Sequence, residues 1–111
     1  MNATIYHNPR CSKSRAALAL LTEAGADVTV VEYLKTPPTR DELAALFERA
    51  DLTPREALRA TETEAKPLKN AGDATILDAM ARHPILIERP IVETAKGVVI
   101  ARPPERIREV L

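Results

Sequence analysis

The chain has 111 residues and a mass of 12.2 kDa, close to the commonest size of a single compact domain. Hydrophobic residues make up 45% and charged residues 29%, a balance that excludes the disordered and membrane-spanning classes. Sixteen basic residues balance sixteen acidic ones, and the chain has one Phe and no Trp, so we expect neither nucleic acid nor a membrane as a partner.

The first third of the chain predicts the order strand, helix, strand. Ala3–Tyr6 has strand composition and stops at the turn-forming His7-Asn8-Pro9. Apolar residues recur at helical spacing over Ser12–Ala24, and Gly25 follows where a helix ends. The β-branched run Val28–Tyr33 predicts a buried strand, parallel to the first through a right-handed crossover.

The middle of the chain predicts short helices. Thr39 with Glu42 forms a capping box, and Thr53 with Glu56 forms another, so two short helices are expected. The segment 61–72 is polar and without periodicity, which indicates a surface excursion.

The last third predicts a helix, a β-hairpin and a final helix. Asp73 can cap a helix that must end near His83, because Pro84 follows. Apolar strand runs over 85–87 and 90–93 flank Glu88-Arg89, and a turn at Lys96-Gly97 precedes a third run. A last helix opens at Pro103-Pro104. This order predicts an α/β fold: a thioredoxin-like (glutaredoxin-like) mixed sheet with a helical insertion, in one domain over 1–111.

Cys11 is the most informative residue, because a single cysteine can form neither an internal disulfide nor a thiolate metal cluster. It stands in a loop that opens a helix, where backbone N–H groups and the helix dipole lower a thiol pKa. This placement favours a reactive thiol over an inert buried one. In the run C-x-x-S, Ser14 stands where a dithiol oxidoreductase has its resolving cysteine, so any redox partner must be external.

The other candidate residues have two interpretations each. His7 either holds positive charge near Cys11 or only hydrogen-bonds the loop, and the residues alone slightly favour the second. Arginines at breaks between elements usually lie on a solvated surface. Arg89 differs because Pro90 biases it toward an extended backbone, where it would face the helix N-terminus that bears Cys11. No metal site is expected from two His and one Cys.

Three separated segments, in the right order and spanning nearly the whole chain, carry a resemblance to the glutaredoxin-linked arsenate reductase family. These are YHNPRCSKSR at 6–15, HPILIERPIV at 83–92 and RPPE at 102–105. The resemblance implies that Cys11 is the nucleophile, that His7 favours its thiolate and that Pro90 is a cis-proline. It also implies that three arginines bind the oxyanion: Arg59, Arg89 and Arg102.

The function implied by this resemblance is reduction of arsenate to arsenite, with glutathione and glutaredoxin as partners and no bound cofactor. A glutathione-dependent thiol reductase and a Spx-like regulatory protein of the same fold remain as alternatives. Some regulators carry C-x-x-C at this loop, and Ser14 argues against that branch. Met1–Thr4 lacks the basic start and apolar run of a signal peptide, so we expect a cytoplasmic protein, and a monomer.

Overall fold

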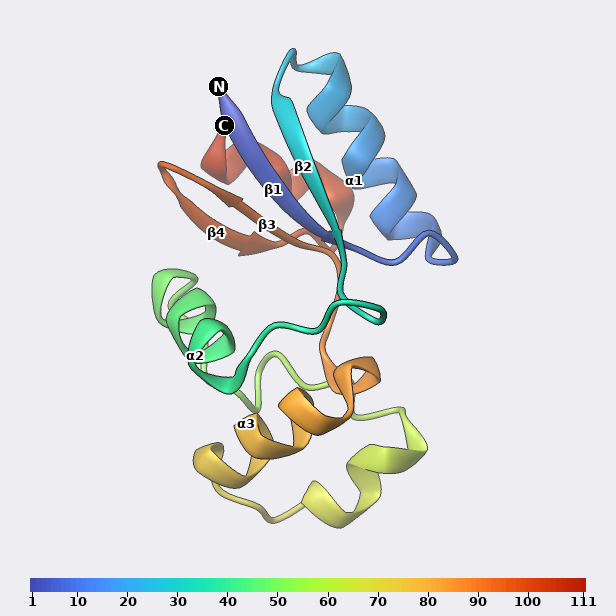
Figure 1. Cartoon of the computed structure of the whole chain (residues 1–111), viewed down its shortest axis with the longest axis vertical. Coiled ribbons are helices and arrows are strands. Elements are labelled where there is room, and N and C mark those ends of the chain that lie inside the picture. Colours follow the sequence, from blue (N-terminus) through green and yellow to red (C-terminus); the bar gives the residue numbers. More distant parts are fainter. The chain divides into compact units, whose positions relative to one another are not determined.

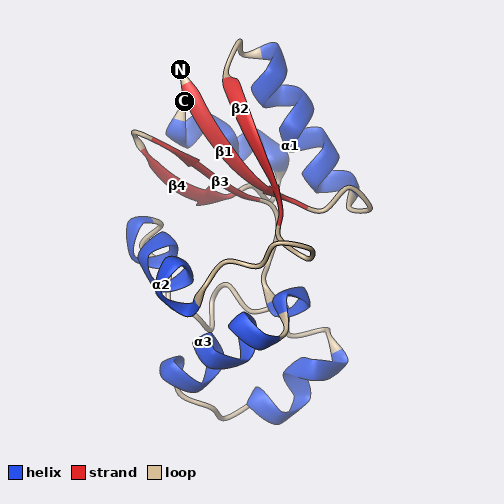
Figure 2. Ribbon diagram, viewed as in Figure 1, coloured by secondary structure: helices blue, strands red, loops and turns tan.

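The computed structural model describes all residues 1–111 and divides them into two compact units (Figure 1). The first unit consists of Met1–Thr36 and Arg89–Leu111, and the second of Pro37–Glu88. All four strands belong to the first unit, whereas the second is built from helices and turns (Figure 2). None of the helices has the length and apolar character that crossing a membrane requires.

The sheet of the first unit has the strand order β2-β1-β3-β4. Its strands are β1 (Asn2–His7), β2 (Asp27–Glu32), β3 (Ile91–Thr94) and β4 (Gly97–Ile100). β1 pairs in parallel with β2 and antiparallel with β3, and β3 pairs antiparallel with β4. The predicted parallel crossover and C-terminal hairpin are therefore confirmed, as is a thioredoxin-like mixed sheet with the helical segment inserted between β2 and β3.

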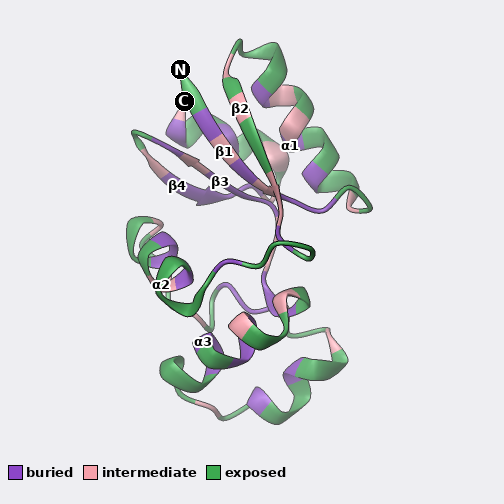
Figure 3. Ribbon diagram, in the orientation of Figure 1, coloured by how far each residue is buried: buried purple, intermediate pink, exposed green.

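Two helices pack against this sheet. α1 (Ser12–Glu23) contacts β1, and the 3₁₀ helix η3 (Pro104–Val110) contacts β3, β4 and α1. Burial follows this arrangement, with buried residues along the helix sides that meet the sheet (Figure 3). The core cluster contains Ala3, Ile5, Ala17, Leu21, Val92, Val99, Ala101, Ile107 and Val110.

The prediction of a buried second strand is wrong. β2 is an edge strand, with β1 as its one neighbour in the sheet, and Val30 is 46% exposed. Its β-branched run reflects a preference for the pleated backbone, which does not depend on burial of both faces. A β-branched stretch therefore predicted the strand correctly and its burial incorrectly.

The second unit packs α2 (Arg40–Arg49) against α3 (Asp73–Arg82). The capping box of α2 is confirmed: the side chain of Thr39 accepts from the N–H of Glu42, and the Glu42 side chain accepts from the Thr39 N–H. Gly72, rather than Asp73, is the residue at the N-cap of α3. The helices bury apolar residues, among them Leu43, Leu46, Phe47, Ile76 and Met80.

Thr53 and Glu56 form their reciprocal hydrogen bonds, but no helix follows. The backbone leaves the helical path because the Arg59 N–H donates to the Leu86 carbonyl and the Glu88 N–H donates to the Ala57 carbonyl, both at 2.8 Å. The same pairing corrects the strand expected at 85–87. Pro84–Leu86 is a short 3₁₀ helix, η2, and only Ile87 forms a bridge, with Leu58.

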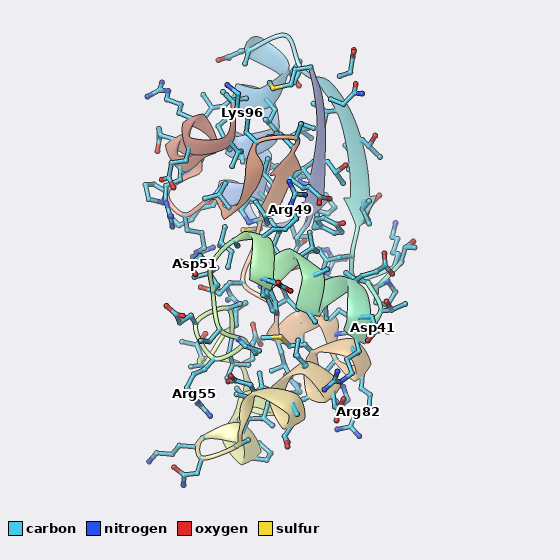
Figure 4. The ribbon with its side chains drawn as sticks, turned by 90° about the vertical axis from the view of Figure 1, so that its left-hand side faces the viewer. Asp41, Arg49, Asp51, Arg55, Arg82 and Lys96 are labelled. Atoms are coloured by element: carbon cyan, nitrogen blue, oxygen red, sulfur yellow. The ribbon has the colours of Figure 1, made fainter.

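The segment predicted as a surface excursion contains the 3₁₀ helix η1 (Thr63–Leu68), which buries Ala65 and Leu68. The side chain of Arg55, labelled in Figure 4, holds the end of η1. Its Nη2 donates to the carbonyl oxygens of Leu68 at 2.9 Å and Ala71 at 2.6 Å. The sequence did not predict the burial of this segment, because two buried residues without helical periodicity form no recognisable pattern.

Candidate active site

Cys11 lies at the N-cap of α1, directly after a tight turn that leaves β1. Its N–H donates to the carbonyl oxygen of Asn8 at 3.0 Å, and the Asn8 side-chain oxygen accepts from the N–H of Arg10, also at 3.0 Å. The Cys11 carbonyl accepts from the N–H of Arg15 at 3.0 Å and so begins the helix. Hydrogen bonds on both sides therefore fix the backbone that carries the thiol.

The pKa of the Cys11 thiol is lowered from its ordinary value. Burial opposes this shift, because it raises the pKa. Hydrogen bonds to the sulfur from the backbone N–H of Ser14, the side chain of Arg89 and the backbone N–H of Lys13, together with the positive charge of Arg89, more than offset it. The thiolate is the nucleophilic form of cysteine, so this environment makes Cys11 more reactive near neutral pH.

Arg102 is linked to Arg89, and through it to Cys11, by hydrogen bonds. Its Nη1 donates to the carbonyl oxygen of Arg89 at 3.1 Å. The Ala101 N–H donates to the Pro90 carbonyl at 2.9 Å, which holds the segment before Arg102 beside the segment after Arg89. The expected cis peptide at Pro90 is confirmed. Three of the predicted site residues, Cys11, Arg89 and Arg102, are thus brought together in the first unit.

His7 acts through Ser14. Its Nδ1 lies 2.6 Å from the Ser14 Oγ, which also accepts from the Asn8 N–H at 3.0 Å. Burial lowers the pKa of His7, and the nearby Arg15 lowers it further, while Glu32 opposes the shift. The ring is therefore neutral near pH 7. The hydrogen bond to Ser14 places His7 against the loop that carries Cys11, and its effect on the thiolate remains a prediction.

Arg59 belongs to the second unit, where two carboxylates hold it. Nε donates to Glu62 and Nη1 donates to Glu88, each at 3.2 Å, and the Arg59 side chain is 18% exposed. These bonds use two of the three guanidinium nitrogens. Its role with the first-unit arginines remains a prediction.

The role of Ser14 in this site was missed from the sequence. Ser14 was interpreted only as a missing second thiol, yet its side chain is fully buried. Ser14 is buried because it forms one buried stripe of α1 with Ala17 and Leu21, at helical spacing. A hydroxyl on an apolar stripe needs a buried partner, and that rule points to a polar side chain on the preceding loop. The carboxylates around Arg59 had no comparable signal.

The arrangement presents a thiol of lowered pKa that is hydrogen-bonded by the Arg89 side chain, and a second guanidinium, that of Arg102, is bonded to the Arg89 carbonyl. Guanidinium groups can bind a tetrahedral oxyanion, and a thiolate beside them can attack its central atom. No group of three or more His, Cys, Asp or Glu side chains comes together as metal ligands.

Comparison with known proteins agrees with this geometry. The sequence profile of the ArsC family matches residues 6–110. An arsenate reductase of Rhizobium meliloti is 46% identical over 115 residues, covering 100% of this chain and 82% of the relative. An arsenate reductase of Synechocystis is 49% identical, over 96% and 79% of the two chains. The solved arsenate reductase from Vibrio cholerae superposes with a TM-score of 0.94 at 42% identity, over 100% and 98% of the two chains. The chain therefore belongs to the ArsC family.

Proposed function

We propose that this protein is an arsenate reductase in which Cys11 is the nucleophile and arginines bind the substrate. The observation that carries the proposal is the thiol of lowered pKa bonded to Arg89, with Arg102 anchored to the same residue. Relatives of 46% and 49% identity that are named arsenate reductases support it. A guanidinium fork matches two oxygens of a tetrahedral oxyanion, which is the form of arsenate near neutral pH.

The first step is attack of the Cys11 thiolate on arsenic. A sulfur–arsenic bond forms, and one arsenate oxygen leaves as water. Arg89 and Arg102, and by resemblance Arg59, neutralise the charge on the remaining oxygens as the arsenic becomes more crowded. Binding by guanidinium groups does not need to exclude phosphate, which has the same tetrahedral shape, because phosphate does not accept electrons from a thiol and selectivity then lies in the chemistry.

The second step needs an external thiol, because Cys11 is the only cysteine. The glutathione sulfur attacks the Cys11 sulfur, the sulfur–arsenic bond breaks, and its electron pair stays on arsenic, which becomes As(III). Cys11 and glutathione are left joined by a disulfide, and a glutaredoxin thiolate then takes over the glutathione. Both reductants belong to the reducing thiol pool of the cytoplasm, where we place the protein.

The test is turnover of arsenate in the presence of glutathione, glutaredoxin and glutathione reductase, followed through NADPH. We expect multiple turnovers with the wild type and none with Cys11→Ser, because a hydroxyl is a far weaker nucleophile at neutral pH. Ser12→Ala, a change at an exposed neighbour, is the matched control and should retain activity. Substantial turnover by folded Cys11→Ser, or none by the wild type in the complete system, would refute the proposal.

A further inference from the structure

A hollow of about 180 Å³ lies beside the loop that carries Cys11. Its wall comes from four consecutive residues, 7–10, that end β1 and begin that loop, from Glu32 at the end of β2, and from Leu34 and Lys35 in the turn that follows. The backbone of this turn is fixed, because the Glu32 carbonyl accepts from the N–H groups of Lys35 and Thr36, both at 2.9 Å. The hollow is therefore a built feature of the first unit.

The wall carries both signs of charge. The ammonium of Lys35 lies 3.5 Å from a carboxylate oxygen of Glu32, and both side chains are open to solvent. Arg10 is exposed, and its guanidinium has no partner in the chain; only its backbone N–H is bonded, to Asn8. Leu34 adds an apolar side chain that is 43% exposed. None of these side chains is among the groups that lower the pKa of Cys11.

We propose that this hollow receives the γ-glutamyl arm of glutathione while the glutathione sulfur is at Cys11. The inference rests on the proposed function, which makes glutathione the reductant. The γ-glutamyl arm ends in a carboxylate and an ammonium, which match Arg10 and Lys35 on one side and Glu32 on the other. Its methylene groups match Leu34. The glycyl arm ends in a carboxylate alone and leaves Glu32 without a counterpart.

Size and position agree with an arm rather than the whole tripeptide. A volume of about 180 Å³ is below the roughly 300 Å³ at which pockets for whole small ligands begin. Arg10 directly precedes Cys11 in the chain and lines the hollow, so a ligand held covalently by the sulfur begins next to a residue of the wall. The covalent tether supplies most of the binding, and the hollow supplies orientation and selectivity.

A reaction without arsenate tests separately whether the hollow recognises the γ-glutamyl arm. The Cys11 thiolate attacks one sulfur of oxidised glutathione, the disulfide bond breaks, one glutathione stays on Cys11, and the other leaves as a thiolate. We measure this rate with oxidised glutathione and with the disulfide of Cys-Gly, which lacks the γ-glutamyl arm. The ratio of the two rates in one protein cancels differences in the fraction of Cys11 thiolate.

After correction for the reagents' own reactivity, we expect the wild type to react about fivefold to tenfold faster with oxidised glutathione than with the Cys-Gly disulfide. This ratio corresponds to the free energy of one or two solvent-exposed charge contacts. Arg10→Gln, Lys35→Gln and Glu32→Gln should each lower this ratio. The matched control is Arg108→Gln, which removes the same charge from an exposed position on η3 of the same unit and should leave the ratio unchanged.

Two results would overturn the assignment. One is a ratio near one in the wild type, or a ratio that Arg10→Gln and Lys35→Gln leave unchanged. The other is a higher ratio in Glu32→Gln, which would mean that the hollow attracts any anion and does not recognise the ammonium. The assay contains no arsenate, so it still tests the hollow if the protein does not turn over arsenate. Conversely, the protein can turn over arsenate even if the hollow does not bind the γ-glutamyl arm.

Discussion

Replacing Ser14 with alanine tests how the reactive loop is held. The Ser14 side chain is fully buried, and its Oγ bonds two groups of the loop, the Nδ1 of His7 at 2.6 Å and the N–H of Asn8 at 3.0 Å. Both partner residues are themselves buried, 6% and 8% exposed, so water does not easily replace the lost hydroxyl. Alanine leaves two buried polar groups without a partner.

The magnitude follows from those two groups. Each buried donor or acceptor that loses its partner costs about 1–3 kcal/mol, so Ser14→Ala, which leaves two such groups, should lower the free energy of unfolding by about 2–6 kcal/mol. Small domains have about 5–15 kcal/mol in total. With a shift of about 4 °C per kcal/mol for a chain of this size, Tm should fall by about 8–24 °C.

The measurement is thermal and urea unfolding followed by circular dichroism, with Ser12→Ala as control. Ser12 has the same chemistry in the same turn of α1 but is exposed, so its change should stay within about 0.5 kcal/mol. The double variant His7→Ala/Ser14→Ala should show a coupling of about 1 kcal/mol or more. Equal melting of Ser14→Ala and Ser12→Ala, or no coupling with His7, would refute this account of the loop.

Three further changes test the site. Lysine in place of arginine keeps the charge but loses the fork, and we expect at least about a tenfold loss of kcat/KM for arsenate at each of three positions, Arg59, Arg89 and Arg102. Arg82→Lys, at the exposed end of α3, should have no effect (Figure 4), and an equal loss there would show that the cluster is misplaced. Arg89→Met should move the pH profile of Cys11 alkylation by iodoacetamide to higher pH, because the thiol pKa loses a lowering contribution; an unmoved profile would contradict the contact. The folded state holds the pKa of His7 below its ordinary value of about 6.5, so the unfolded chain binds the proton more readily and wild-type stability should fall as pH drops below about 6.5. His7→Gln should lose this dependence, and identical pH–stability curves would show that His7 does not carry it.

Short sequence patterns predicted the helices, strands and turns correctly wherever interactions between neighbouring residues determine them. The capping box at Thr39 and the turn at Gly25, which has φ of 79°, are decided by neighbours in sequence. The box at Thr53 gave the right hydrogen bonds and the wrong element, because the pairing of Leu58 with Ile87 takes the backbone out of the helix. That pairing joins residues 29 positions apart, and no local pattern reports it.

The candidate site also combines features set by local backbone geometry with features set by contacts between distant residues. Cys11 was predicted from its place between a strand and a helix, and Arg89 from the proline that follows it, since both depend on backbone geometry. The bond from Arg102 to the Arg89 carbonyl and the two carboxylates on Arg59 depend on side-chain contacts across long separations. Their positions could be named through the family resemblance, but their partners could not.

Ser14 connects the structure of the loop with the need for an external reductant. A cysteine at this position would supply a resolving thiol, but sulfur is a weak donor and acceptor, and the bonds to His7 and Asn8 would be lost or weakened. The same two residues set the turn from which Cys11 hydrogen-bonds Asn8. A hydroxyl at position 14 therefore keeps the nucleophile in place and leaves it without an internal partner. In this chain, the stability of the reactive loop and the reliance on a second molecule for electrons follow from one side chain.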